Sequence, residues 1–268
     1  MSKILKEMKN IRLKKLYNFV FGFIALIALS QYSEANTNVF NYEYSLGVGF
    51  TTTKILGNNP AINTISPINV VDPPGGSFNG AMPGIEVKGQ YKLDEIGDWR
   101  LVGGINYNFY SARERIPRDI STFRLMNSVN ILSPLVGINY TLMRFPTAMS
   151  FVYVGVEARY NYIHAISLIR QEEITTTGEI EEFEFTGKEA AGRIGGLVKI
   201  GLEGELYENY MINVSWGIDA LNLLGADDSR GQLLTPFAPE RFNSSLGVEQ
   251  EEELTYNFYF SIMIQYRY

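Results

Sequence analysis

The chain has 268 residues, of which 46% are hydrophobic and 13% aromatic, with 17 Tyr, 16 Phe and no Cys. A mean hydropathy of −0.05 excludes a multi-helix membrane protein, and this aromatic content excludes a disordered chain. The formal charge is −6, so a nucleic-acid partner is not expected, and the absence of Cys excludes disulfides and thiolate metal sites.

The N-terminus has the pattern of an export signal. Six basic residues precede an apolar run from Tyr17 to Leu29, which is too short to span a bilayer comfortably. Ser33 and Ala35 are small residues at the two positions that a signal peptidase reads. We predict a signal peptide over residues 1–35 and one mature domain over 36–268. An uncleaved membrane anchor is the alternative, and the lack of Cys excludes a lipoprotein.

Alternation of apolar and polar residues with a period of two, typical of β-strands, dominates the rest of the chain. It is clearest from Tyr256 to Tyr268, and the stretch from Phe40 through Tyr42 to Phe50 shows it too. Six further segments fit the same pattern. The eight predicted strands are residues 40–50, 81–92, 99–110, 128–142, 150–163, 190–204, 210–220 and 256–268.

The spacers between these strands alternate in length, with short ones at 93–98, 143–149 and 205–209 and long ones at 51–80, 111–127, 164–189 and 221–253. Antiparallel transmembrane barrels show this pattern, with tight periplasmic turns and longer outer loops. We predict an all-β fold, an eight-stranded antiparallel up-and-down transmembrane β-barrel. A soluble β-sandwich or soluble barrel is the alternative; strand length and aromatic residues at strand ends count against it.

The last strand resembles the C-terminal assembly signal of bacterial outer-membrane proteins in its apolar residues Phe260, Ile262, Ile264, Tyr266 and Tyr268. The mature chain is similar to small outer-membrane barrels of the OmpA, OmpX and OmpW kind. Its Tyr-rich strands and residues 131–140 also resemble the outer-membrane β-barrel domains of the Bacteroidota, including the PorT-like group. The resemblance implies an outer-membrane location, contact with outer-membrane lipid, and the barrel-assembly machinery as partner of the last strand.

Pro134 lies inside a predicted strand. Proline cannot donate a hydrogen bond to a β-ladder, and a closed barrel has no edge on which to place it. We therefore expect a bulge or a locally broken hydrogen bond at this position.

The polar face of the predicted strands lines the lumen, which in an eight-stranded barrel is only wide enough for side chains. We predict that its charges pair in a structural network, because an unpaired buried charge costs several kcal/mol. A narrow gated channel whose ion pairs exchange partners is the alternative. The predicted network consists of Glu43, Glu86, Lys88, Arg100, Glu157, Arg159, Arg193, Lys199, Glu203, Asp219 and Arg267.

His164 is the only histidine, and Ser167 follows three residues later. Some outer-membrane barrels are lipid A deacylases with His and Ser two apart on the lipid-facing side, whereas a spacing of three puts the two side chains on opposite faces of an extended chain. The glycines Gly192, Gly195 and Gly196 lie within a predicted strand with no following helix, which argues against a phosphate-binding loop. We predict no catalytic residue and no cofactor.

Two predicted loops are acidic, over 172–184 and 249–253. Carboxylates are ligands for Ca²⁺, but the spacing matches no calcium loop, so we expect solvated faces and no metal site.

The sequence predicts a non-enzymatic outer-membrane protein that acts through its surface loops, on an extracellular ligand the sequence does not identify, or as a membrane-stabilising element. The alternatives are a narrow channel for small or hydrophobic solutes and a lipid-modifying enzyme.

Overall fold

The computed structural model describes residues 42–65, 75–174, 176–186, 188–236 and 251–268; the predicted signal peptide lies outside them. Within these ranges, three single-turn 3-10 helices are η2 (Pro60–Ile62), η3 (Pro146–Ala148) and η4 (Asp228–Arg230). No helix in the described part is long and apolar enough to cross a membrane. The strands are β1 (Tyr44–Ile55), β2 (Met82–Lys92), β3 (Trp99–Pro117), β4 (Ser121–Phe145), β5 (Ser150–Ile174), β6 (Ile180–Thr186), β7 (Ala191–Tyr207), β8 (Tyr210–Leu224) and β9 (Tyr256–Arg267).

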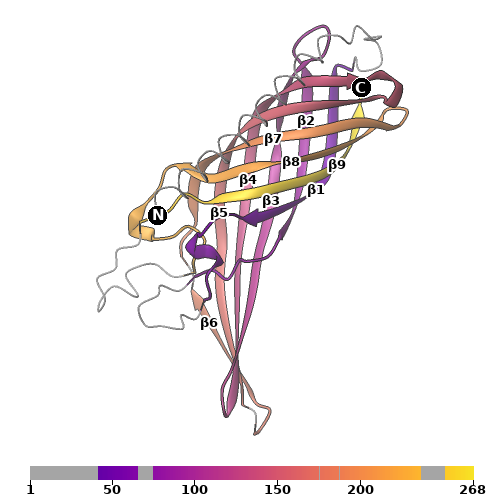
Figure 1. Ribbon diagram of the computed structural model, residues 1–268. Helices are drawn as coiled ribbons and strands as arrows, with labels where there is room; N and C mark the ends of the chain where they lie inside the picture. The colour runs from indigo at the N-terminus through magenta and orange to yellow at the C-terminus, as the bar shows by residue number, and fades with distance from the viewer. Residues whose placement is uncertain (1–41, 66–74, 175, 187, 237–250) are drawn as a thin grey trace, which may run out of the picture.

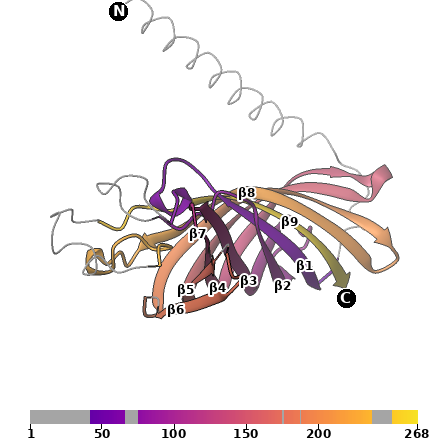
Figure 2. The same ribbon diagram turned by 90° about the horizontal axis from the view of Figure 1, so that it is seen from below.

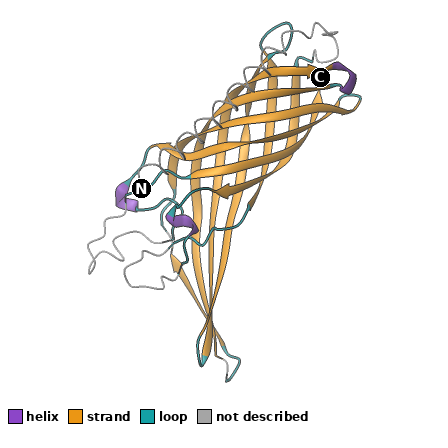
Figure 3. Ribbon diagram, viewed as in Figure 1, coloured by secondary structure: helices purple, strands orange, loops and turns teal. Residues whose placement is uncertain are grey.

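Eight of these strands close into an antiparallel barrel in the order β1-β2-β3-β4-β5-β7-β8-β9 (Figures 1 and 3). The ring closes where β1 pairs with β9, with Leu46 opposite Tyr266 and Phe50 opposite Ile262. Closure removes the free edges that an open sheet would present. The predicted eight-stranded antiparallel barrel is confirmed.

The period-two pattern of the sequence separates the two faces of the barrel wall. In β1, the side chains of Leu46, Val48 and Phe50 point outward and are exposed, whereas Ser45 and Thr51 are buried inside. The barrel is thus apolar outside and polar within, the reverse of a water-soluble fold.

The three turns at one end of the barrel are short, as predicted, and we call this the turn end. In the β2–β3 turn, the carboxylate of Asp94 accepts hydrogen bonds from the backbone N–H groups of Asp98 and Trp99. In the β7–β8 turn, Tyr207 pairs with Tyr210 across only two residues. The C-terminus also lies at the turn end (Figure 1).

Two of the predicted long loops are mostly strand, which corrects the prediction for residues 111–127 and 164–189. β3 and β4 pair without interruption as far as Pro117 and Thr122, and β5 continues to Ile174, where β6 pairs with it. Where both faces of a sheet meet water, a strand continues although the apolar alternation that reveals it fades.

The far parts of β3, β4 and β5, together with β6, form a sheet that projects beyond the barrel at the end opposite the turn end (Figures 1 and 2). We call this sheet the extension and this end the loop end. The extension starts where the pairing with β2 and β7 ends. β2 pairs with β3 only as far as Asn108, and β7 pairs with β5 only as far as Ile163.

The β4–β5 ladder omits Ser133 and Pro134 and resumes in the same register at Leu135. The expected local break at Pro134 is thus confirmed, without a bulge. The register shifts of this ladder lie elsewhere, between Ser128 and Asn130 and between Thr141 and Met143.

The start of the first strand differs from the prediction. Phe40 lies outside the described residues, and β1 begins at Tyr44. Tyr42, expected on the outward face, is buried and donates a hydrogen bond from its hydroxyl to Glu203. Because Tyr42 precedes the paired strand, strand alternation does not fix its direction.

Candidate functional site

The outer surface carries a girdle of aromatic side chains at the turn end. Ring centroids of Trp99 and Tyr140 are 4.6 Å apart, and those of Tyr210 and Tyr266 are 5.2 Å apart. Tyr266 in turn lies 4.8 Å from Tyr268. These side chains come from four different strands, so the rings follow the barrel circumference.

A second group of outward-facing rings, the loop-end girdle, is formed by Tyr107, Phe109, Tyr162 and His164. The ring centroids of Tyr107 and Phe109 are 4.8 Å apart, and the rings of Tyr162 and His164 stack at 5.4 Å. About ten residues of β3 separate the girdles, which at roughly 3.3 Å per residue and a tilt of roughly 40° gives a height of roughly 25 Å. This is the height of the apolar band of transmembrane barrels, and the barrel spans a membrane.

The middle of the lumen is occupied by a carboxylate that binds three cations, which we call the central cluster. Oε1 of Glu157 on β5 lies 2.6 Å from Nζ of Lys199 and 3.0 Å from Nζ of Lys88. Oε2 lies 2.7 Å from Nη2 of Arg159. Gly155 gives the Lys199 side chain room, because a Cβ at Gly155 would lie 2.8 Å from its Cε.

Two further carboxylates make the central cluster neutral. Glu86 lies 2.9 Å from Lys88, and Asp219 lies 3.6 Å from Arg159. The hydroxyl of Tyr259 donates to Glu86 over 2.6 Å, and the Arg159 guanidinium lies 4.8 Å from the centre of the Tyr259 ring. Paired charges of equal number block the lumen without presenting one sign to a passing ion.

Arg100 and Glu203, predicted in the same network, form a separate group near the turn end. The guanidinium of Arg100 is buried between the rings of Tyr42 and Phe151, at 5.1 and 4.2 Å from their centres. Glu203 accepts a hydrogen bond from the hydroxyl of Tyr42. Tyr42 therefore contacts both charged groups at this end of the lumen.

Three residues of the predicted network lie outside the barrel interior or at its rim. Glu43 is exposed because it precedes β1. Arg267, near the end of β9, pairs with Glu205 at 2.5 Å on the turn-end rim. Arg193 pairs at the loop end with Glu252, at 2.6 Å.

Glu252 was expected in a solvated acidic loop, and its burial corrects that prediction. Besides Arg193, it accepts hydrogen bonds from the side chain of Asn222 and the backbone N–H of Asp227. Although burial opposes ionisation, the hydrogen bonds from Arg193 and Asn222 lower the pKa of Glu252. Glu252 stands in a run of acidic residues, so nothing in the sequence distinguished it as the partner of Arg193. Glu249 lies outside the described residues.

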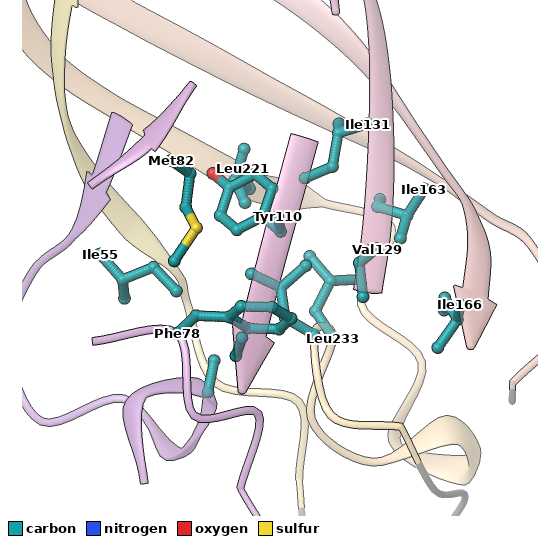
Figure 4. Packing of buried hydrophobic residues seen from close by; sticks show 13 residues of the cluster. Ile55, Phe78, Met82, Tyr110, Val129, Ile131, Ile163, Ile166, Leu221 and Leu233 are labelled. Carbon is teal, nitrogen blue, oxygen red and sulfur yellow. The ribbon is translucent and has the colours of Figure 1, made fainter. Parts of the chain in front are cut away.

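Apolar side chains fill the lumen at the loop end, and we call them the plug. Phe78, from the segment between β1 and β2, packs edge-to-face on Tyr110 with ring centroids 5.6 Å apart (Figure 4). The whole cluster comprises Ile55, Ala61, Phe78, Met82, Tyr110, Ala112, Val129, Ile131, Ile163, Ile166, Leu221, Leu233 and Leu234. The plug holds two loops in the barrel mouth.

Lys188 fixes the loop that carries Leu233 and Leu234. Its ammonium donates to the carbonyl of Gln232 over 2.6 Å and to the hydroxyl of Thr235 over 3.0 Å. Burial, with a smaller contribution from Arg230, lowers the pKa of Lys188 to about 7.

The other acidic segment lies on strands of the extension. Glu172 pairs with Arg170 and Glu173 with Arg124, each at 2.7 Å, and Glu182 accepts from Gln171 over 2.7 Å. No group of three or more potential metal-ligating His, Cys, Asp or Glu residues occurs among the residues that the structure describes.

The expectation that His164 and Ser167 lie on opposite faces is wrong. Ala165 has a φ of 52° and lies in the bulge opposite Val129, where the β4–β5 register shifts. Buried positions on β5 change there from odd to even numbers, with Ile163 and Ile166 both inside. His164 and Ser167 are thus both outward, and His164 contacts the rings of Tyr107 and Tyr162.

No protein-family model matches the chain, and no curated protein matches it. Among solved structures it is similar to neisserial surface protein A (NspA), with 10% identity, a TM-score of 0.41 and coverage of 84% of this chain and 97% of that one. It is also similar to Ail, the attachment invasion locus protein of Yersinia pestis, with 11% identity, a TM-score of 0.41 and coverage of 85% and 99%. The barrel topology itself is the one expected; the PorT-like detail stays a prediction.

Proposed function

We propose that this is an exported, non-enzymatic outer-membrane protein whose barrel serves as an anchor and whose extension recognises a partner at the cell surface. The observation that carries the proposal is the extension itself, a sheet of four strands paired far beyond the last contacts of β2 and β7. A membrane anchor alone would need none of these pairings.

The extension offers two recognition features. Beyond Asn108, β3 has no pairing with β2, and β6 is the last strand of the sheet among the described residues. Such edges pair with extended segments of other chains. Apolar side chains are also exposed near its tip, with Ile120 at 71% and Ile180 at 61% exposure.

The lumen supports a role outside the barrel rather than through it. Tyr42, the central cluster and the plug fill it at three successive levels. His164 contacts the rings of Tyr107 and Tyr162, which supports a role in the girdle rather than in catalysis.

The test is a variant that keeps the barrel pairings and removes the extension. Residues 111–127 and 165–189 are each replaced by a short Gly-Asn turn, and adherence of whole cells to polystyrene and to a mucin-coated surface is measured. We expect the variant to remain heat-modifiable on gels and to fractionate with the outer membrane, while adherence is lost. A Phe78→Ala variant, with an intact extension, is the matched control. Equal adherence of the shortened variant would overturn the proposal.

One observation favours the alternative of a narrow channel. Near the turn end, the buried atoms Arg100 Nε, Arg100 Nη2, Gln90 Oε1 and Asn139 Oδ1 have no hydrogen-bond partner among the described residues, so this part of the lumen suits water. The plug opposes conduction, and planar-bilayer recordings separate the two readings. A channel would show stable single-sized steps in the wild type, whereas we expect none.

A further inference from the structure

Three arginines gather on the outward face of the extension, and we call them the arginine patch: Arg113 and Arg115 on β3 and Arg124 on β4. Arg115 lies directly opposite Arg124 in the ladder, and Arg113 lies opposite Met126. Together with Glu114, Met126 and Gln171 they line a shallow hollow of about 300 Å³.

The patch lies on the same side of the sheet as the lipid-facing residues. Along β3, burial alternates from Trp99 to Pro117, with odd-numbered residues on the outer side. Phe109 of the loop-end girdle, Arg113 and Arg115 therefore follow one another on a single face. The patch is directly above the apolar belt rather than over the lumen.

The patch begins just above the polar layer of the membrane. Four and six residues separate Phe109 from Arg113 and Arg115, which at roughly 3.3 Å per residue and a tilt of roughly 40° places them about 10 and about 15 Å above the girdle. The headgroup layer extends roughly 5–8 Å beyond the hydrocarbon. The arginine side chains therefore approach this layer by bending toward the membrane, while their stems cover apolar surface.

Carboxylates of the described residues neutralise the charges of the patch only in part. Arg124 pairs with Glu173, but both side chains are exposed, at 49% and 40%, and such pairs contribute little. Among the described residues, no carboxylate pairs with Arg113 or Arg115. Like charges directly opposite each other on a sheet are destabilising, so Arg115 and Arg124 favour an anion between them.

We propose that the arginine patch binds the phosphate of an anionic lipid headgroup in the outer leaflet. Guanidinium groups present paired N–H donors that match phosphate oxygens, and Met126 supplies an apolar side to the hollow. This site concerns the membrane-facing side of the extension and does not depend on what its tip recognises.

The experiment measures lipid binding to the purified full chain in a neutral detergent. The probes are short-chain phosphatidylglycerol and phosphatidylcholine with identical acyl chains, titrated by calorimetry. We expect the wild type to prefer phosphatidylglycerol. Arg115→Gln should reduce the preference on the order of tenfold, as for lost charge-assisted hydrogen bonds, and replacing all three arginines by Gln should abolish it. Arg115→Lys should fall between.

Lys54→Gln is the matched control, because Lys54 is an exposed base on the outward face of β1, opposite Phe258. The control should keep the preference, and the gel shift on boiling verifies that every variant folds. Equal binding of both lipids to the wild type, or an unchanged preference in the triple variant, would overturn the proposal. Displacement of the lipid by inorganic phosphate at equal affinity would overturn the assignment to lipid, and tighter displacement by polyglutamate would indicate an acidic protein partner instead.

Discussion

The carboxylate of Glu157 on β5 lies 2.6 Å from the ammonium of Lys199 on the adjacent β7. The same oxygen lies 3.0 Å from Lys88 on β2, three strands away around the ring. This carboxylate therefore ties distant walls of the barrel together through the lumen. These ion pairs stabilise the barrel and obstruct its lumen.

Replacing Glu157 by Ala should destabilise the barrel strongly. Three buried cations, Lys88, Arg159 and Lys199, would lose their shared partner. Removing one partner of a buried ion pair costs about 3–5 kcal/mol, and Arg159→Ala should fall in the same range because it removes the cation that pairs with Asp219. Urea unfolding of the protein refolded into lipid vesicles measures the change. Glu182→Ala, on the extension, is the control, and equal midpoints for wild type and Glu157→Ala would contradict the pairing.

Tyr42→Phe should loosen the turn end without unfolding the barrel. The change removes the hydroxyl that donates to Glu203 but keeps the ring beside Arg100. A hydrogen bond to a charged group contributes about 1.5–3 kcal/mol, so the free energy of unfolding should fall by about that amount. Tyr42→Ala should cost more, since the ring contact is also lost. Tyr210→Phe, in the exposed girdle at the turn end, should leave stability unchanged; a similar loss there would mean that Tyr42 has no special role.

Lys188 should make stability rise with pH. Its native pKa is about 7, below its ordinary value of 10.5, so between these values the unfolded chain binds more protons than the native one. The free energy of unfolding therefore increases across that window, and below pH 7 the cost of burying the charge is fully present. Unfolding midpoints at about pH 6 and about pH 9 should differ more for wild type than for Lys188→Met. An identical pH dependence in both proteins would refute this assignment, with Lys54→Met as the exposed control.

Deleting residues 265–268 should sharply lower the amount of folded protein in the outer membrane. Gln265, Tyr266 and Arg267 pair with β1, and the N–H of Tyr268 donates to the carbonyl of Tyr44 over 2.8 Å. Loss of this closure would leave backbone groups unpaired in hydrocarbon, at several kcal/mol each. Membrane fractionation and protease protection measure the effect. Replacing residues 36–39, which lie outside the described part of the chain, should matter far less, and equal folded levels for the two variants would contradict the role of β9 in closure.

The barrel wall could be predicted from the amino-acid sequence alone. A lipid-facing strand must be apolar on one side and a filled lumen polar on the other, so residues such as Val48 and Glu157 carry the pattern directly. The short turns could also be predicted, because the alternation of apolar and polar residues stops at each of them. Even the break at Pro134 followed from the chemistry of a single residue.

The contacts across the lumen and the full length of the strands could not be predicted from the sequence, because both depend on how the strands pack in three dimensions. Glu252 contacts Arg193 although 59 positions separate them, and no local pattern distinguishes that carboxylate from its acidic neighbours. The bulge at Ala165 moves Ser167 to the outer face, which alternation alone does not reveal. The extension escaped detection because both its faces meet water: backbone pairing continues to Pro117, whereas the hydrophobic contrast that identifies a strand depends on the membrane and ends with it.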